Sequence, residues 1–129
     1  MTELPNFEKL PSILSYDEVA RVLSNIMDVI ESGATISINE VEELLNEGLF
    51  ALEYNPKGRF DEALCNRITR WVELNWHRGD ESFIDGAIAL YVNFASNNAA
   101  REFFTRMLEQ EERATVRDEL RDALDNDLY

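Results

Sequence analysis

The most apolar segment of the chain is Phe83-Ile84-Asp85-Gly86-Ala87-Ile88-Ala89-Leu90-Tyr91-Val92-Asn93-Phe94. Its apolar side chains recur at helical spacing and cover most of the circumference of a helix instead of one stripe. A helix that is apolar on most sides must be covered by neighbours on most sides. We therefore predict that this segment, started by Asp80 or Glu81, is the central and most buried helix of an all-α fold.

A long amphipathic helix is predicted just before this segment, over residues 60–78, with Gly79 closing it. Asn75 takes the central position of the apolar face in the last turn, where we expect a buried or half-buried amide with a local partner. Trp71 lies in the middle of the face and is predicted to pack in the core. Trp76 lies at the edge of the face, so both core packing and a role in an interface stay open.

Two shorter helices are predicted after the central segment. Ser96-Asn97-Asn98 reads as a turn, and Thr115 as the N-cap of the last helix. Their apolar positions are Phe103, Phe104, Met107 and Leu108 in the first and Val116, Leu120, Ala123 and Leu124 in the second.

The first half of the chain carries two capping boxes. Ser15 with Glu18 and Ser37 with Glu40 have the spacing in which each side chain can satisfy a free backbone N–H at a helix start. Gly33 is the predicted stop of the first helix. Both helices show apolar stripes of helical period, which completes the all-α prediction.

The whole chain, 1–129, is predicted to be a single helical domain. Residues 1–14 form an N-terminal arm interrupted by two prolines, and residues 55–58 (Asn-Pro-Lys-Gly) form the strongest turn. The helices then fall into pairs over 16–54, 60–95 and 99–125, each close in length to a helical-hairpin repeat.

Residues 83–126, which include the central segment and the two helices after it, resemble HEAT-type repeats. The likeness is greatest in Thr115-Val116-Arg117-Asp118-Glu119-Leu120-Arg121-Asp122-Ala123-Leu124, which is similar to the second helix of such a repeat. The resemblance implies three antiparallel helix pairs stacked as a short right-handed solenoid. An irregular six-helix bundle is the alternative.

Composition limits the classes of function. The 129 residues include 26 acidic and 12 basic ones, a formal net charge of −14, which disfavours direct binding to nucleic acid or to an anionic membrane. One cysteine allows no internal disulfide, and no signal sequence or membrane-spanning run is present, so a cytoplasmic protein is expected. A protein partner with a basic surface is favoured instead.

Motifs of catalysis are absent from the sequence. Glu73 and His77 are spaced i, i+4, yet a catalytic zinc needs three protein ligands and His77 is the only histidine. Cys65 is predicted to be a buried, unreactive thiol. We therefore expect no metal site, no cofactor and no enzymatic activity, with acid–base chemistry by carboxylates as a remote alternative.

Negative charge is concentrated at the two ends of the chain. Acidic residues greatly outnumber basic ones over 1–54 and 109–129, whereas the two balance over 55–108. Like-charge neighbours on a helix reduce its stability, so a dense carboxylate field can be maintained for a cationic partner or can simply be a solvated face. The predicted partner-binding residues are Asp28, Glu31, Glu40, Glu42, Glu43 and Glu47, with Glu53 beside them and Trp76 as an apolar anchor.

A small acidic helical domain of this kind resembles the immunity proteins of bacterial polymorphic and contact-dependent toxin systems. The local likeness lies in Arg67-Ile68-Thr69-Arg70-Trp71-Val72-Glu73, in Trp76 and in Phe83-Ile84-Asp85. The resemblance implies a stoichiometric inhibitor of a cognate toxin domain, which in such systems is often a basic nuclease. A HEAT-like adaptor or regulatory subunit of a larger complex is the alternative, and the sequence leaves the oligomeric state open.

Overall fold

The computed structural model describes residues 16–33, 35–50 and 61–127, which are helical apart from short connections and contain no strand. The predicted all-α fold is confirmed. The elements are α1 (Tyr16–Glu31), α2 (Ile38–Phe50), α3 (Glu62–Asn75), the 3-10 turn η1 (Trp76–Arg78), α4 (Glu81–Phe94), α5 (Asn97–Gln110), α6 (Ala114–Asp122) and the π-helical turn η2 (Ala123–Asp127).

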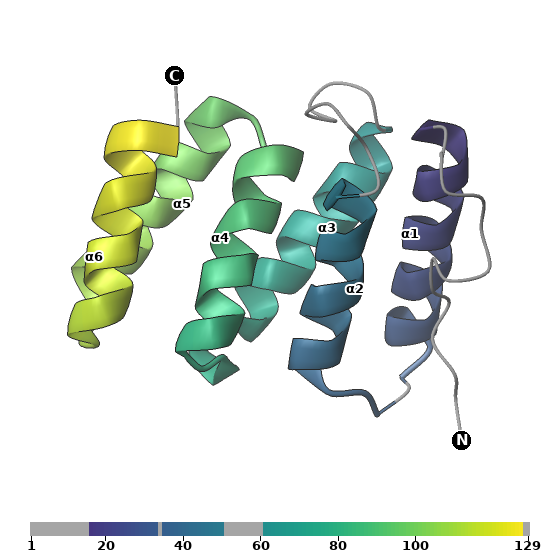
Figure 1. The fold of residues 1–129 in the computed structure, drawn as a ribbon, viewed down its shortest axis with the longest axis horizontal. Coiled ribbons are helices and arrows are strands. Elements are labelled where there is room, and N and C mark those ends of the chain that lie inside the picture. The colour runs from purple at the N-terminus through teal and green to yellow at the C-terminus, as the bar shows by residue number, and fades with distance from the viewer. Residues whose placement is uncertain (1–15, 34, 51–60, 128–129) are drawn as a thin grey trace.

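The helices follow one another along the long axis of the molecule, with α1 at one end and α6 at the other (Figure 1). In this view α2, α4 and α6 lie in front of α3 and α5. Helix α4 contacts α2, α3, α5 and α6, and Phe83, Ile84, Ala87 and Leu90 are fully buried. The prediction that this segment is the central helix is therefore confirmed.

Aromatic side chains join the middle helices. The Trp71 ring of α3 meets Phe83 of α4 edge-on, with centroids 5.7 Å apart. Tyr91 of α4 stacks on Phe103 of α5 at 4.4 Å, and Trp76 meets the same Phe103 edge-on at 5.3 Å. Such pairs add roughly 1 kcal/mol each to the burial of the rings. They fix the positions of α3, α4 and α5 relative to one another.

Two of the predicted helix starts, those of α2 and α4, agree with the structure, and those of α5 and α6 differ from it. Asp80 caps α4 by accepting from the Phe83 N–H at 2.8 Å, as predicted, and α2 begins directly after Ser37. Ser96 caps α5 by accepting from the Ala99 N–H at 3.2 Å. Asn97 and Asn98 therefore lie in the first turn of α5, and the prediction that they form a turn is wrong.

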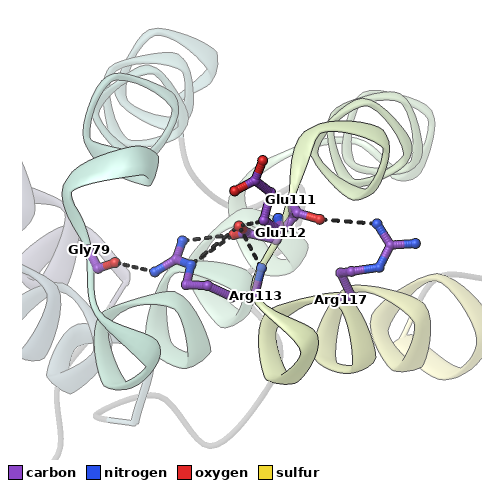
Figure 2. Close-up of polar contacts among 5 residues, drawn as sticks. All are labelled: Gly79, Glu111, Glu112, Arg113 and Arg117. Atoms are coloured by element: carbon purple, nitrogen blue, oxygen red, sulfur yellow. Dashed lines mark hydrogen bonds and ion pairs between the residues drawn. The ribbon is translucent and has the colours of Figure 1, made fainter.

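The start of α6 is determined by arginines, not by Thr115. The N-cap position belongs to Arg113, whose guanidinium donates to Oε1 of Glu111 and to the Gly79 carbonyl, both at 2.7 Å (Figure 2). Arg117 donates to the carbonyls of Leu108 at 2.9 Å and Glu111 at 3.0 Å, which satisfies acceptors left free at the end of α5. These contacts fix the connection two residues ahead of Thr115, and the predicted N-cap is wrong.

The third predicted helix, 60–78, corresponds to α3 and η1 together. The Asn75 side chain is buried, donates to the Trp71 carbonyl at 2.9 Å and accepts from Arg78 at 3.1 Å, so the prediction of a buried amide with a local partner is confirmed. The N-terminal arm 1–14, the capping residue Ser15, Glu53 and the turn at 55–58 lie outside the described residues.

Candidate functional site

An acidic groove lies between α2 and α4. It is an open hollow of about 460 Å³, lined by Glu42, Glu43, Asn46 and Glu47 from α2 and by Ser82, Asp85, Gly86 and Ala89 from α4. Four of these eight side chains are carboxylates, and none is basic. The groove brings together three of the predicted partner-binding residues, Glu42, Glu43 and Glu47.

Gly86 leaves room for the Glu42 side chain at the contact between α2 and α4. A Cβ atom at this position would collide with the carboxylate of Glu42, which lies against the glycine backbone. Asn46 completes the contact, because its side-chain nitrogen donates to Oε2 of Glu42 at 3.1 Å and to the Gly86 carbonyl at 3.3 Å. A glycine inside a helix costs roughly 1 kcal/mol relative to alanine, and here it makes room for a carboxylate.

Glu42 is only 8% exposed. Burial raises its pKa above the usual value for a glutamate; the Asn46 hydrogen bond opposes this shift, and the negative charges of Glu43, Asp85 and Asp80 add to it. Glu42 therefore packs at the contact between two helices, so the alternative of a simple solvated face does not hold for this residue. Its negative charge is held there by one amide and by no basic side chain that lines the groove.

A second carboxylate with a raised pKa, the half-buried Glu119, lies on α6. Burial raises the pKa of Glu119, and Asp85 and Glu81 raise it further, which places this side chain near the acidic residues of α4. Its Oε2 atom is buried with no hydrogen-bond partner among the described residues. Because α4 contacts both α2 and α6, acidic side chains continue across three helices. We call Glu42, Glu43, Glu47, Asp85 and Glu119 the acidic band.

Asp28 and Glu31 belong to a different part of the molecule. Arg67 of α3 donates to Oδ1 of Asp28 at 2.7 Å and to both oxygens of Glu31, at 2.7 and 3.1 Å, and so links α1 to α3. The arginine lowers the pKa of Glu31. Glu40 is exposed in the first turn of α2 and does not line the groove. The single carboxylate field expected from the sequence is thus divided.

Trp76 is 1% exposed and packs against Phe103 in the core. A side chain this deeply buried presents no surface to a partner. The prediction that Trp76 is an apolar anchor for a partner is therefore wrong, and Trp76 belongs to the core. The broad apolar face of α3 continues into η1, and the tighter 3-10 turn carries the indole inward.

The sequence did not predict four residues of this site, which are Asn46, Asp85, Gly86 and Glu119. Asp85 lies next to the acidic residues of α2, and Glu119 lies near Asp85, only because α2 and α6 both pack on α4. Nothing in the sequence around either residue signals this. Gly86 did carry a signal, because a glycine inside the most apolar helix indicates that another element approaches closely.

The remaining candidates for chemistry are Glu73, His77 and Cys65. Glu73 pairs with Arg106 at 3.3 Å, and His77 is exposed in η1. Burial raises the pKa of the half-buried Cys65 thiol. In the part of the chain that the structure describes, no three side chains of the metal-binding types gather into one group, and no helix is long and apolar enough to cross a membrane.

Comparison of the chain with protein-family models, with curated proteins and with solved structures gives no match.

Proposed function

We propose that this chain is a non-catalytic protein that inhibits a basic partner by stoichiometric binding, as an immunity protein inhibits its toxin, and that the partner docks on the acidic band. The observation that carries the proposal is the α2–α4 groove, whose lining includes four carboxylates and no basic side chain. A toxin nuclease domain has the required charge, because its own substrate is a polyanion.

The electrostatics of the groove favour a cationic occupant. Glu42 is buried without a basic neighbour in the groove lining, and a lysine or arginine from a partner would supply the missing counter-charge. Glu43, Glu47 and Asp85 are exposed at the rim, where carboxylates speed the encounter with a basic surface and make it dependent on salt. Buried and exposed carboxylates would thus act on dissociation and association respectively.

The contacts between helices support a stacked, HEAT-like arrangement as part of this proposal. The helices within each predicted pair contact one another, and between pairs α1 contacts α3, α2 contacts α4, and α4 contacts α6. Stacked helix pairs produce this pattern, in which one row of helices forms a continuous binding surface. An adaptor or regulatory subunit of a larger complex would use the same surface and is the second candidate. In both cases the protein acts in the cytoplasm, without a cofactor and without binding nucleic acid.

The first experiment tests inhibition. The chain is co-expressed with the toxin encoded beside its gene, and growth is expected to be restored only when the inhibitor is present. The purified pair is then studied by binding kinetics at two ionic strengths.

Two variants distinguish the effect of charges in the acidic band from the effect of total charge. E43Q/E47Q/D85N removes three charges at the groove, and E109Q/E112Q/D125N removes three exposed charges on α5, the α5–α6 connection and η2. We expect association at low salt to slow about tenfold in the first variant, in line with the loss of steering, and to change little in the second. Equal effects of the two variants would contradict docking on the acidic band, and a neighbouring gene product without toxicity would favour the adaptor.

A further inference from the structure

A second hollow, of opposite character, lies on the other side of α2. It has a volume of about 690 Å³ and opens between α1, the α1–α2 connection and α3. Ile30 and Ile36 contribute to one wall, and Leu74 to the other. Three arginines, Arg67, Arg70 and Arg78, are part of its lining, and it shares no lining residue with the acidic groove. We call it the arginine groove.

The three arginines and Leu74 lie along one face of α3 and η1. Their spacing of i, i+3, i+7 and i+11 places them in a row that is about 16 Å long at the helical rise of 1.5 Å per residue. Leu74 stands near the middle of the row and is 71% exposed, the one large apolar side chain that the described ranges leave in solvent. A row of this length fits about three turns of a helical peptide and is too long for one small anion.

Two of the three arginines have no acidic partner in the part of the chain that the structure describes. Arg67 is held by Asp28 and Glu31, as described above. Arg70 is exposed and makes no hydrogen bond or ion pair with any residue that the structure describes. Arg78 donates to the amide oxygen of Asn75 at 3.1 Å and, within the same ranges, to no carboxylate. Within the described ranges, two guanidinium groups without a carboxylate partner thus lie in the same groove as an exposed leucine, in a chain with 26 acidic residues. Such a combination suits a ligand that carries both carboxylates and apolar groups.

We propose that the arginine groove docks an acidic amphipathic segment of a partner protein. Apolar side chains of that segment contact Leu74 and the isoleucine wall, and its carboxylates bond to Arg70 and Arg78.

A peptide fits better than a nucleic acid for two reasons. The Trp71 ring is 6% exposed, so no open aromatic face is available for stacking bases, and the chain carries a net charge of −14. The inference does not depend on the proposed function, since it concerns a different groove and a partner of opposite charge.

The probe is a fluorescein-labelled peptide of about three helical turns, with leucine at helical spacing and glutamate elsewhere. Fluorescence anisotropy is expected to show saturable binding that weakens as salt is added. The same peptide with lysine in place of glutamate is expected not to bind. In an ¹H–¹⁵N spectrum of the complex, the indole signal of Trp71, which lines the groove, is expected to shift more than that of the buried Trp76.

Variants of exposed residues test the contacts. Urea unfolding of each variant checks that the fold is retained, because R78Q also removes the hydrogen bond to the buried Asn75. R70Q/R78Q is expected to weaken binding about tenfold, as two rim ion pairs of roughly 0.7 kcal/mol would do. L74E places a negative charge at the centre of the row and is expected to weaken binding by more than that. R101Q/R121Q, which makes the same change of charge at exposed positions on α5 and α6, is the matched control and is expected to change affinity less than twofold.

Three results would overturn the proposal. The first is the absence of saturable peptide binding up to about 1 mM, the weak limit of specific association. The second is an equal loss of affinity in R70Q/R78Q and in R101Q/R121Q, which would indicate a general charge effect. The third is tighter binding of a single-stranded oligonucleotide than of the acidic peptide, which would assign the groove to nucleic acid.

Discussion

Acidic side chains have opposite electrostatic environments at two helix contacts, α1 with α3 and α2 with α4. Between α1 and α3, Asp28 and Glu31 share the guanidinium of Arg67, and the three side chains remain partly in solvent. Between α2 and α4, Glu42 is buried against Gly86, its hydrogen bond comes from Asn46, and other carboxylates are its charged neighbours in the groove. Among the described residues, the carboxylates of the first contact have a basic partner, whereas Glu42 has none in the lining of its groove.

This difference indicates which carboxylates would gain free energy from binding a cationic partner. An ion pair that is already formed gains little from a partner, because binding would have to break it. A buried carboxylate without a counter-charge lowers the stability of the free protein and regains that energy when a cation arrives. The two contacts therefore suggest a structural role for Asp28, Glu31 and Arg67 and a binding role for Glu42 and its neighbours.

The largest expected effect comes from reversing the charge of Arg67. R67E removes two ion pairs and places a third carboxylate beside Asp28 and Glu31, which we expect to lower the free energy of unfolding by about 2 kcal/mol. Urea unfolding at low salt measures the change. R70E is the matched control, because Arg70 is exposed one turn away and pairs with no described residue. Equal losses in both variants would show that the contact between α1 and α3 does not depend on the ion pairs.

The same substitution at the two contacts should act with opposite sign. E31Q removes an ion pair and is expected to reduce the free energy of unfolding by roughly 0.5 kcal/mol. E42Q keeps the size of the side chain and relieves repulsion from Glu43, Asp85 and Asp80, so we expect a gain of about 1 kcal/mol at neutral pH. A loss of stability in E42Q would mean that the negative charge of Glu42 supports the fold, and the comparison would fail.

The pH dependence of these two variants sharpens the comparison. Glu42 has a pKa raised above 4.5 in the folded state, so the native chain holds this proton more tightly, and ionisation of Glu42 costs stability as pH rises above 4.5. The gain in E42Q should vanish in acid and increase as pH rises through the folded-state pKa. Glu31 has a lowered pKa, so the loss in E31Q should be full above 4.5 and disappear as pH falls through the pKa of the folded state. Unfolding of both variants and the wild type across this range provides the test.

The fold could be predicted from periodicity to a large extent, and the errors have local causes. The all-α class and the central position of Phe83–Phe94 follow from apolar spacing, which packing reinforces. The starts of α5 and α6 were misplaced by two positions or fewer, because Asn97 entered a helix capped by Ser96 and because Arg113 fixed the chain ahead of Thr115. Side chains that bond across the fold determine such boundaries, and sequence spacing does not contain them.

The candidate site could be predicted only in part. Charge counting identified Glu43 and Glu47, but it could not distinguish Glu31, which meets an arginine 36 residues away, from Glu42, which meets Asp85 and the backbone of Gly86. The burial of Trp76 could not be predicted, because a residue at the edge of an apolar face is buried or exposed depending on where the neighbouring helix packs. Both distinctions depend on which helix packs on which, and only the three-dimensional arrangement supplies this.

The smallest expected effect tests whether Gly86 is present for the sake of Glu42. In G86A alone, the new methyl group displaces the Glu42 carboxylate, and the better helix propensity of alanine is offset by the lost contact with Asn46. In an E42A background the space is free, so G86A should raise the free energy of unfolding by roughly 0.5 to 1 kcal/mol. A double-mutant cycle of E42A, G86A and the double variant measures the coupling between the two positions. If G86A changes stability equally in both backgrounds, the glycine is not required by the carboxylate, and the contact between α2 and α4 must have another cause.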